Sequence, residues 1–367
     1  MYEGKKVIVV NATALRSGGA LSILSQFIRS IEGDDEYLIF VHPSIDFCVD
    51  NESIRIVRIE RTSFFSRIFW DSYGLDVYLK KEKIEVKVII SLQNTSIRIT
   101  QSCEKVIYLH NIIPFVNYRW NLFKRSDFNL FLYRYIYSFF IFLYVSKNTH
   151  FIVQSEWFKN ILIKRGVQED RVLVARPEIM ISNVQGIPAV SLTSNGYSIF
   201  YPATAHSYKN HIEIVNALIY MKRYGGYHSD ITVYFTIDLD ESSELYRTIN
   251  ENGLNEHFNF LGYLSFNDIL SYYKSVNLVV FPSRLETFGL PLIEAAAMGK
   301  PILAIDMMYS REALQNYHNV SFCEFNDSKN WAEEILLGIK KNKAEAMFVA
   351  NNGWSRVHQL INELKVC

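Results

Sequence analysis

The segment from Pro282 to Pro301 constrains the fold most strongly, because it places a loop and a short helix between two apolar strands. The apolar run Asn277–Phe281 precedes it and Ile302–Asp306 follows it, and both runs have the length of buried strands. Pro291 suits the first turn of a helix, where its missing N–H removes no hydrogen bond, and Gly299 suits the end of that helix. The sequence therefore predicts strand, loop, helix and strand in that order.

Two carboxylates, Glu286 and Glu294, stand on either side of the predicted helix start. The Gly-Leu-Pro break between them lets the two side chains approach one ligand from two sides. The free N–H groups of the first helical turn suit phosphate or sugar oxygens. A binding site and an ordinary crossover with two solvated acids are both compatible with this spacing, which alone does not decide between them.

Strands and helices alternate along the rest of the chain, a pattern typical of parallel sheets that bind ligands at their carboxyl edge. A chain of 367 residues is long enough for two such domains. The polar, turn-rich segment 182–196 is the predicted linker between them. Further predicted strands are Lys6–Val10, Tyr37–His42, Ile54–Ile59, Val86–Leu92 and Val172–Ile179.

Composition narrows the class of protein. A hydrophobic content of 49% is typical of a folded enzyme, and the formal net charge of zero gives no indication of a nucleic-acid partner. Residues 1–183 carry an excess of Lys and Arg, which suits an anionic membrane surface but is also compatible with uneven surface charge alone.

The cysteines and the N-terminus indicate the compartment. The sequence contains no Cys-x-x-Cys pair, so it indicates neither a zinc site nor a disulfide framework. The N-terminus lacks the apolar core of a signal peptide. These features predict a cytoplasmic protein. The four cysteines are widely spaced, at Cys48, Cys103, Cys323 and Cys367.

Three further positions carry polar chemistry next to predicted strands. Gly18 and Gly19 lie between the first strand and a predicted helix from Ala20 to Ile31, although the motif G-x-G-x-x-G is absent and a simple turn is the alternative. His110 directly follows the predicted strand Lys105–Leu109, at the edge where active-site side chains gather. Lys209 lies just before a predicted helix, where it can oppose a diphosphate, or where it is a solvated turn residue.

The ordered residues of the segment 282–301 resemble the E-x7-E signature of the family 4 retaining glycosyltransferases, which have the GT-B fold. This resemblance is strong over residues 197–312 and loose before them. It implies an α/β protein of two facing Rossmann-like domains with parallel sheets, and a C-terminal helix that crosses back to the first domain. The matching residues are Pro282, Ser283, Glu286, Phe288, Gly289, Leu290, Pro291, Glu294, Ala295, Gly299, Lys300 and Pro301.

The resemblance also assigns roles. It implies that Glu286 holds the donor sugar, that Glu294 holds the ribose hydroxyls and that Lys209 stabilises the departing diphosphate. His110 is expected near the sugar or the acceptor, without being the base, and Gly18 and Gly19 at the border of the donor and acceptor cleft. The remaining expected donor-binding residues are Gly262 and Tyr263, near the nucleobase, and Arg284, Phe288, Gly289 and Leu290.

One departure from the family pattern concerns the phosphate side. Family members commonly carry an Arg five residues before the Lys, and this chain has Thr204 there. Arg284, His206 or main-chain donors are the candidates to replace it. Asp238 and Asp240 form an Asp-x-Asp that could hold a metal, as in the GT-A fold, but their position deep in the second half favours a solvated turn.

The run Phe128–Val145 contains 18 residues with one charge, Arg134. Its length nearly permits a membrane span, but the internal arginine and the tyrosines argue against one. A buried helix is the main interpretation. A helix lying in the bilayer interface is the alternative, aided by Arg119, Lys124 and Arg125 and by a second apolar stretch, Phe64–Trp70.

The resemblance implies a retaining glycosyltransferase that moves a hexose-type sugar from a nucleotide-diphosphate sugar to a lipid-linked oligosaccharide, in O-antigen or capsule assembly. No cofactor or metal is expected, and the protein is expected in the cytoplasm with possible peripheral contact with the inner membrane. The alternatives are a GT-B nucleotide-sugar epimerase or hydrolase and a non-catalytic sugar-nucleotide-binding subunit. The expected domains are residues 1–183, on the acceptor side, 184–345, which bind the donor, and 346–367, the returning helix.

Overall fold

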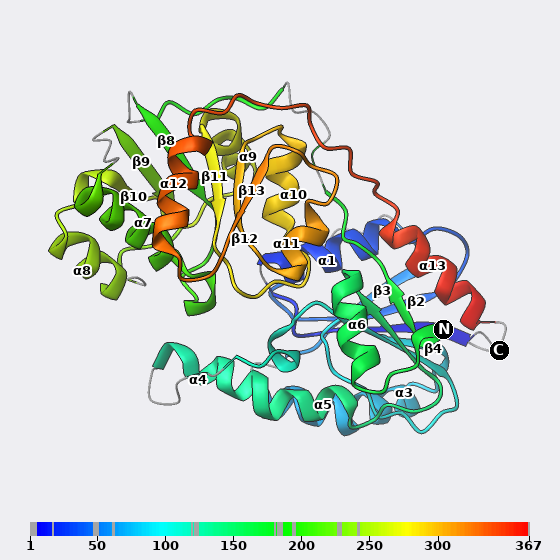
Figure 1. Cartoon of the computed structure of the whole chain (residues 1–367). Helices are drawn as coiled ribbons and strands as arrows, with labels where there is room; N and C mark the ends of the chain where they lie inside the picture. Colours follow the sequence, from blue (N-terminus) through cyan, green and yellow to red (C-terminus); the bar gives the residue numbers. More distant parts are fainter. Residues whose placement is uncertain are drawn as a thin grey trace. The chain divides into compact units, whose positions relative to one another are not determined.

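The chain divides into two units in the computed structural model, Met1–Glu178 with Asn351–Cys367, and Ile179–Ala350 (Figure 1). The expected boundary between residues 183 and 184 lies outside the described residues, as do Arg119, Lys124, Cys48 and Cys367. The structure describes residues 6–16, 18–46, 51–60, 63–118, 120, 125–179, 181, 186–192, 196–225, 230–240 and 243–365.

The first unit is built on a parallel sheet in the order β3-β2-β1-β4-β5-β6-β7. The central strand β1 pairs with β2 on one side, where Val10 is opposite Ile39, and with β4 on the other. Its strands are β1 (Lys6–Ala12), β2 (Tyr37–Val41), β3 (Ile54–Arg58), β4 (Glu85–Ser91), β5 (Glu104–Leu109), β6 (Thr149–Val153) and β7 (Val172–Val174).

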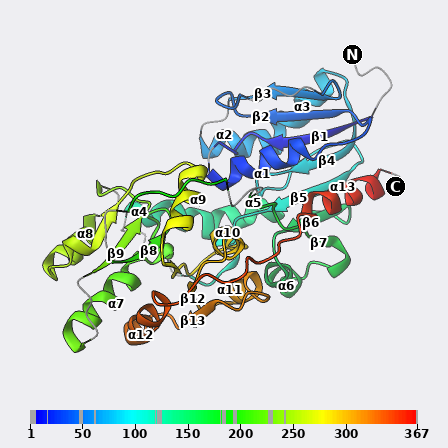
Figure 2. The ribbon, with the colours of Figure 1, turned by 90° about the horizontal axis from the view of Figure 1, so that it is seen from above.

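Helices cover both faces of this sheet, since alternate strand residues enter two separate hydrophobic clusters. One cluster joins β1, β2 and β4 to α1 and to the C-terminal helix α13, and the other joins them to η1 and α3 (Figure 2). The helical segments are α1 (Gly18–Arg29), α2 (Phe64–Phe69), η1 (Trp70–Gly74), α3 (Leu75–Lys81), η2 (Ile113–Phe115), α4 (Arg125–Leu132), η3 (Tyr133–Tyr137), α5 (Ser138–Phe142), α6 (Glu156–Lys164), η4 (Glu169–Arg171) and α13 (Gly353–Leu364).

The C-terminal helix α13 belongs to the first unit although it follows the second in sequence. Trp354 is 2% exposed, its ring stacks on Tyr108, and its Nε1 donates a hydrogen bond to Gln26 Oε1 at 2.9 Å. The predicted return of this helix to the first domain is therefore confirmed.

The second unit has a parallel sheet in the order β10-β9-β8-β11-β12-β13. Its strands are β8 (Tyr197–Tyr201), β9 (Ile231–Phe235), β10 (Phe258–Phe260), β11 (Leu278–Phe281), β12 (Ile302–Ile305) and β13 (Val320–Cys323). Its helical segments are η5 (Ser207–Lys209), α7 (His211–Tyr224), α8 (Ser243–Glu251), η7 (Asn255–His257), α9 (Phe266–Ser275), α10 (Leu290–Ala297), α11 (Met308–Ala313) and α12 (Ser328–Gly338).

Both sheets have the doubly wound strand order, so each has a point where the direction of winding reverses. That point lies between β1 and β4 in the first unit and between β8 and β11 in the second. Ligands of such sheets bind outside the carboxyl ends of the two strands at the reversal. The predicted pair of Rossmann-like domains is thus confirmed, and the fold gives each unit one favoured position for a site.

The prediction that Phe128–Val145 is a buried helix is wrong. The segment forms α4, the π-helix η3 and α5, and it buries Leu130, Tyr137 and Ile141 while Phe139 is 60% exposed. Arg134 donates through Nη1 to the carbonyl of Pro114 at 3.0 Å, which accounts for a charge within the apolar run. The apolar composition of the segment predicted burial on all sides, but the protein covers only one face of this helix.

One other expectation changes in detail. Helix α1 begins at Gly18, so Gly18 and Gly19 form its first turn rather than a preceding loop. Over the residues that the structure describes, no helix has both the length and the apolar character needed to cross a bilayer.

Candidate functional site

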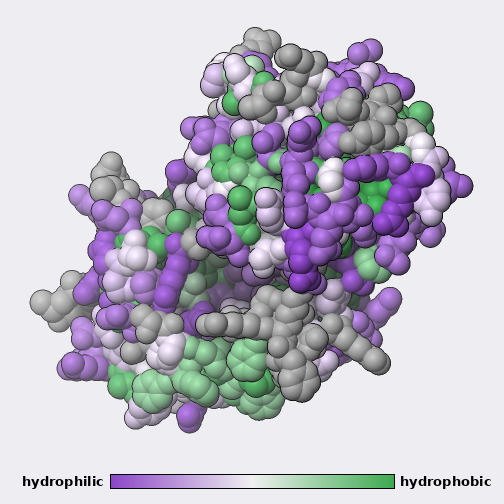
Figure 3. All heavy atoms as spheres, turned by 90° about the vertical axis from the view of Figure 1, so that its left-hand side faces the viewer, coloured by the Kyte–Doolittle hydropathy of each residue, from purple (hydrophilic) through white to green (hydrophobic). Residues whose placement is uncertain are grey.

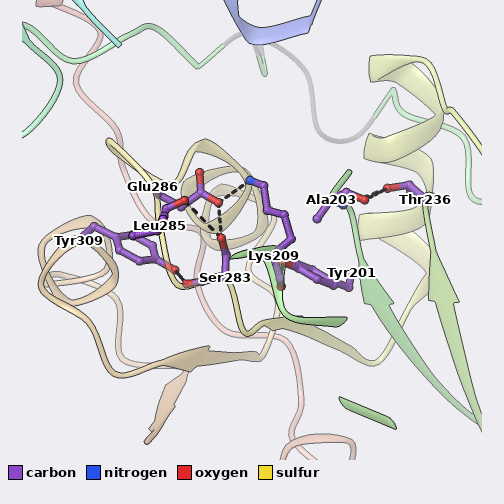
Figure 4. A network of polar contacts seen from close by, with 8 residues as sticks. All are labelled: Tyr201, Ala203, Lys209, Thr236, Ser283, Leu285, Glu286 and Tyr309. Carbon is purple, nitrogen blue, oxygen red and sulfur yellow. Dashed lines mark hydrogen bonds and ion pairs between the residues drawn. The ribbon is translucent and has the colours of Figure 1, made fainter. Parts of the chain in front are cut away.

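The reversal point of the second unit brings together Lys209 and Glu286. Lys209 ends η5 in the loop after β8, and Glu286 lies in the loop after β11, so each follows one of the two strands that flank the reversal. Lys209 Nζ lies 2.5 Å from Glu286 Oε1, and each side chain is 15% exposed (Figure 4). The predicted cation and the first predicted carboxylate thus form a direct ion pair.

Hydrogen bonds from neighbouring residues hold this pair. Ser283 Oγ donates to the same Glu286 Oε1 at 2.7 Å, and the Ser283 carbonyl accepts from the hydroxyl of Tyr309 in α11. Tyr201, the last residue of β8, donates its hydroxyl to the Lys209 carbonyl at 2.6 Å. Ser283 was part of the matching motif, but its spacing to Glu286 gave no signal of this contact. Tyr201 and Tyr309 were not identified from the sequence.

The ion pair sets the charge of Lys209. Burial by itself would lower the pKa of the ammonium, but the adjacent Glu286 carboxylate outweighs it, so the pKa of Lys209 lies above its ordinary value. Lys209 is therefore a cation at neutral pH, beside an anion that another negatively charged group could replace.

Helix α7 begins at His211, two residues after Lys209. Its N-cap residue, Asn210, has left-handed backbone angles (φ 59°) and makes no side-chain capping hydrogen bond. First-turn N–H groups that no side chain caps attract anions. Lys209 and the start of α7 therefore present positive charge at the same strand end.

Thr204, where the family's arginine is missing, and the two side chains that could replace it, His206 and Arg284, have different surroundings. Thr204 and His206 are both exposed, and the His206 ring stacks on Tyr208. Arg284 donates its main-chain N–H to the Tyr208 carbonyl at 2.8 Å, and its guanidinium lies 3.9 Å above the ring of Phe325. Arg284 is thus fixed beside the loop that carries Lys209.

Helix α10 places the second predicted carboxylate. Gly289 precedes the helix with a φ of 80°, a conformation that L side chains rarely adopt, which explains the glycine in the motif. Glu294 Oε2 accepts a hydrogen bond from Tyr273 Oη at 3.4 Å. Burial raises the pKa of Glu294 to about 7, and the Tyr273 hydroxyl offsets only part of that effect.

The other predicted donor-binding residues lie in different environments. Phe288 is 3% exposed, so its ring packs in the core, whereas Leu290 is partly exposed and opens α10. Tyr263 is 88% exposed, next to Gly262, where an added Cβ would lie 2.7 Å from Asp238 Oδ1. Within the described parts of the chain, no group of three or more His, Cys, Asp or Glu side chains is arranged to hold a metal.

In the first unit, His110 follows β5 and its tautomer can be assigned. The Asn94 side-chain carbonyl accepts the main-chain N–H groups of His110 and Asn111, at 2.7 and 3.0 Å. The Asn94 amide group therefore points its NH2 at His110 Nε2, 3.1 Å away, and the ring proton must be on Nδ1.

The environment of His110 keeps this ring neutral. Burial lowers the pKa of His110 to about 4. Nδ1 is buried and has no hydrogen-bond partner among the residues that the structure describes. A neutral ring with a free Nδ1–H can donate to a hydroxyl but is too weakly basic to be charged at neutral pH.

The reversal point of the first unit is occupied by the protein's own side chains. Asp71 accepts hydrogen bonds from Asn11, Gln93 and Thr95 at 2.7, 2.8 and 2.6 Å. Gly18 and Gly19 are exposed, and a Cβ added at either would meet no atom within 4 Å. The start of α1 is therefore open, whereas Asp71 is buried.

Comparison with known proteins finds a family match that covers most of the second unit. Residues 189–353 match the family model described as glycosyl transferases group 1. A segment of 96 residues, 26% of this chain, is 30% identical to the O-antigen chain mannosyltransferase RfbU of Salmonella typhimurium. That segment spans only 27% of the relative's length.

Solved structures match the whole fold at low sequence identity. A glycosyltransferase from Rickettsia africae has a TM-score of 0.69 at 18% identity, over 98% of this chain and 99% of its own. Anabaena HepE in complex with UDP and glucose has a TM-score of 0.62 at 15% identity, over 99% and 98%. Residues 189–353 therefore resemble the glycosyl transferases of group 1, in a chain that has the two Rossmann-like units of the GT-B fold.

Proposed function

We propose that this protein is a retaining glycosyltransferase of the family 4 type, which moves a hexose from a nucleotide-diphosphate sugar to a saccharide acceptor. The observation that carries the proposal is the Lys209–Glu286 ion pair at the reversal point of the second unit. The cation Lys209 and the start of α7 match the diphosphate of a sugar nucleotide, and the carboxylates of Glu286 and Glu294 are acceptors for its hydroxyls. The UDP-bound neighbour with the same fold supports this class of donor.

In this proposal the bond between the sugar and the diphosphate breaks while positive groups receive the charge of the leaving group. Lys209 and the first N–H groups of α7 stabilise the departing diphosphate. Glu286 holds hydroxyls of the donor sugar, and Glu294 holds those of the ribose. The acceptor hydroxyl attacks the anomeric carbon from the face that the diphosphate leaves and passes its proton to the departing diphosphate oxygen, so the anomeric configuration is retained.

The proposal needs no metal or other cofactor, because cationic and N–H groups at the site take the phosphate charge. Transfer activity is expected to persist in excess EDTA. A loss of activity that Mg²⁺ or Mn²⁺ restores would contradict this part of the proposal.

The donor can be identified by thermal unfolding with GDP, UDP and ADP sugars, because a ligand that binds only the folded state raises the unfolding temperature. We expect one base to stabilise the protein more than the others. Transfer is then measured with that donor and candidate acceptors, and the configuration of the product tests retention.

Donor-only turnover separates the proposal from its alternatives. Conversion or hydrolysis of the donor at full rate without acceptor would indicate an epimerase or hydrolase. Donor binding without any turnover, with or without acceptors, would indicate a sugar-nucleotide-binding subunit.

A lipid-linked acceptor in O-antigen or capsule assembly is the setting we propose, supported by the O-antigen relative. A largely aromatic surface of the first unit supports peripheral contact with the cytoplasmic face of the inner membrane; Figure 3 shows an apolar area, in green, at the bottom of the view. Phe64 contacts Tyr137 and Phe140, so α2 lies against η3 and α5. This aromatic surface comprises Phe65, Phe69, Tyr73, Phe128, Tyr135, Ile136, Phe139 and Leu143, each at least 37% exposed.

Sedimentation with phospholipid vesicles tests this contact. Aromatic rings at this exposure suit the interface between headgroups and acyl chains. The wild type should sediment with vesicles containing anionic lipid, and the double variant Phe65→Ser with Phe139→Ser should remain in solution. Equal sedimentation of both proteins would contradict membrane contact through this surface.

A further inference from the structure

The carboxylate of Glu286 is held asymmetrically. Lys209 Nζ and Ser283 Oγ both contact Oε1, at 2.5 and 2.7 Å. Oε2 receives no hydrogen bond from any residue that the structure describes. One oxygen is therefore anchored, and the other is available to a ligand.

The two anchors differ in what happens when a donor binds. Under the proposed function the donor's diphosphate becomes the partner of Lys209. The contact between Lys209 and Glu286 then weakens. Ser283 carries no charge that a phosphate would attract, so its hydrogen bond can persist. Ser283 is then the remaining described anchor of the carboxylate.

Ser283 is itself rigidly placed. It is fully buried, and it lies two residues after the end of β11. Its carbonyl accepts a hydrogen bond from Tyr309, which is 3% exposed. Its hydroxyl has one proton, and the 2.7 Å contact to Glu286 is much shorter than the 3.5 Å alternative to the Leu285 carbonyl.

We propose that Ser283 is a positioning residue that fixes Glu286 through Oε1, so that Oε2 faces the sugar of the bound donor. The inference rests on the proposed function of Glu286. Tyr309 acts one step further away, by fixing the main chain of Ser283.

Comparison of two ligands tests this role, because only one of them carries the sugar. Calorimetry measures the affinity of Ser283→Ala for the stabilising nucleotide sugar and for its nucleoside diphosphate. Loss of a hydrogen bond to a charged group should weaken the nucleotide sugar about tenfold. The nucleoside diphosphate should bind as it does to the wild type, which also shows that the variant is folded.

Two further variants sharpen the test. Ser283→Thr keeps the hydroxyl and should restore most of the affinity for the nucleotide sugar. Ser198→Ala is the matched control, since Ser198 is a buried serine of the same unit that donates to Asn277 Oδ1 at 2.8 Å. The control should leave both affinities unchanged.

The outcomes separate this inference from the proposed function. If Ser283→Ala weakens both ligands equally, or neither, while Glu286→Ala weakens the nucleotide sugar, only the positioning role is overturned. If Glu286→Ala leaves the affinity for the nucleotide sugar unchanged, the proposed role of Glu286 is wrong, and the inference that rests on it is wrong too. A loss of affinity in Ser283→Ala that is confined to the nucleotide sugar supports both the positioning role of Ser283 and the proposed role of Glu286.

Discussion

Each unit has a carboxylate beside the two strands at its reversal point, but the two carboxylates come from different kinds of element and are held differently. In the first unit both oxygens of Asp71 accept hydrogen bonds, from three uncharged side chains. In the second unit both described contacts of Glu286 fall on one oxygen, and one of them is an ion pair. A carboxylate with hydrogen bonds on both oxygens holds neighbouring segments of the protein together, whereas one held at a single oxygen can bind a ligand with the other.

The largest expected effect is on catalysis by Lys209→Ala. Loss of a group that stabilises charge in the transition state lowers kcat about 10²–10³-fold. The same change should leave the circular dichroism spectrum intact. Transfer rates measured with saturating donor provide the check, and a rate within a few-fold of the wild type would remove Lys209 from the reaction.

Asp71→Ala should have its main effect on stability. It leaves the donors of Asn11, Gln93 and Thr95 without their buried acceptor, which should lower the free energy of unfolding by about 3 kcal/mol. Urea titration measures this loss. Donor affinity, measured where the variant is folded, should be unchanged. A stable variant with impaired donor binding would reverse the contrast between the units.

The pH dependence of stability sharpens the same comparison. Burial raises the pKa of Asp71 to about 6 from an ordinary 3.8, although the hydrogen bonds from Thr95, Asn11 and Gln93 oppose it. The folded state therefore binds the proton more tightly than the unfolded state, and this residue's contribution to stability falls as pH rises from about 4 to about 6. Asp71→Asn should remove that slope from the urea titrations, and an unchanged slope would contradict the assignment.

A smaller effect is expected for donor affinity as a function of pH. The pKa of Glu294 is about 7 because the carboxyl is buried, and ribose hydroxyls that donate to it favour its charged form. Donor binding should therefore lower this pKa, so affinity should decrease as pH falls below about 7. Glu294→Gln should bind more weakly with a flatter pH profile, and a wild-type profile in that variant would exclude Glu294 from donor binding.

Periodicity and strand-end chemistry predicted the parallel α/β sheets and the strand-end position of several candidate residues, whereas the GT-B arrangement and the returning helix were implied by the family resemblance. Apolar runs marked the strands, and a residue that follows a strand in a parallel sheet must lie at the carboxyl edge, which placed His110 and Glu286 correctly. Gly289 was interpretable because its backbone conformation is one that glycine tolerates best.

Contacts between loops could not be predicted in the same way. The Lys209–Glu286 pair joins residues 77 positions apart, and its formation depends on how two loops fold after neighbouring strands. The hydrogen bond from Ser283 depends on one side-chain rotamer. The exposure of Phe139 depends on which face of its helix the sheet covers, which composition does not encode.

Calorimetric titration with the nucleoside diphosphate that best stabilises the wild type tests the central claim most directly. The claim is that the Lys209 side of the second unit binds the donor's diphosphate, while the Asp71 network of the first unit is structural. Lys209→Ala should weaken binding at least about tenfold, as expected for a lost charged hydrogen bond, and Asp71→Asn should bind like the wild type. Equal affinities of Lys209→Ala and the wild type would contradict the account.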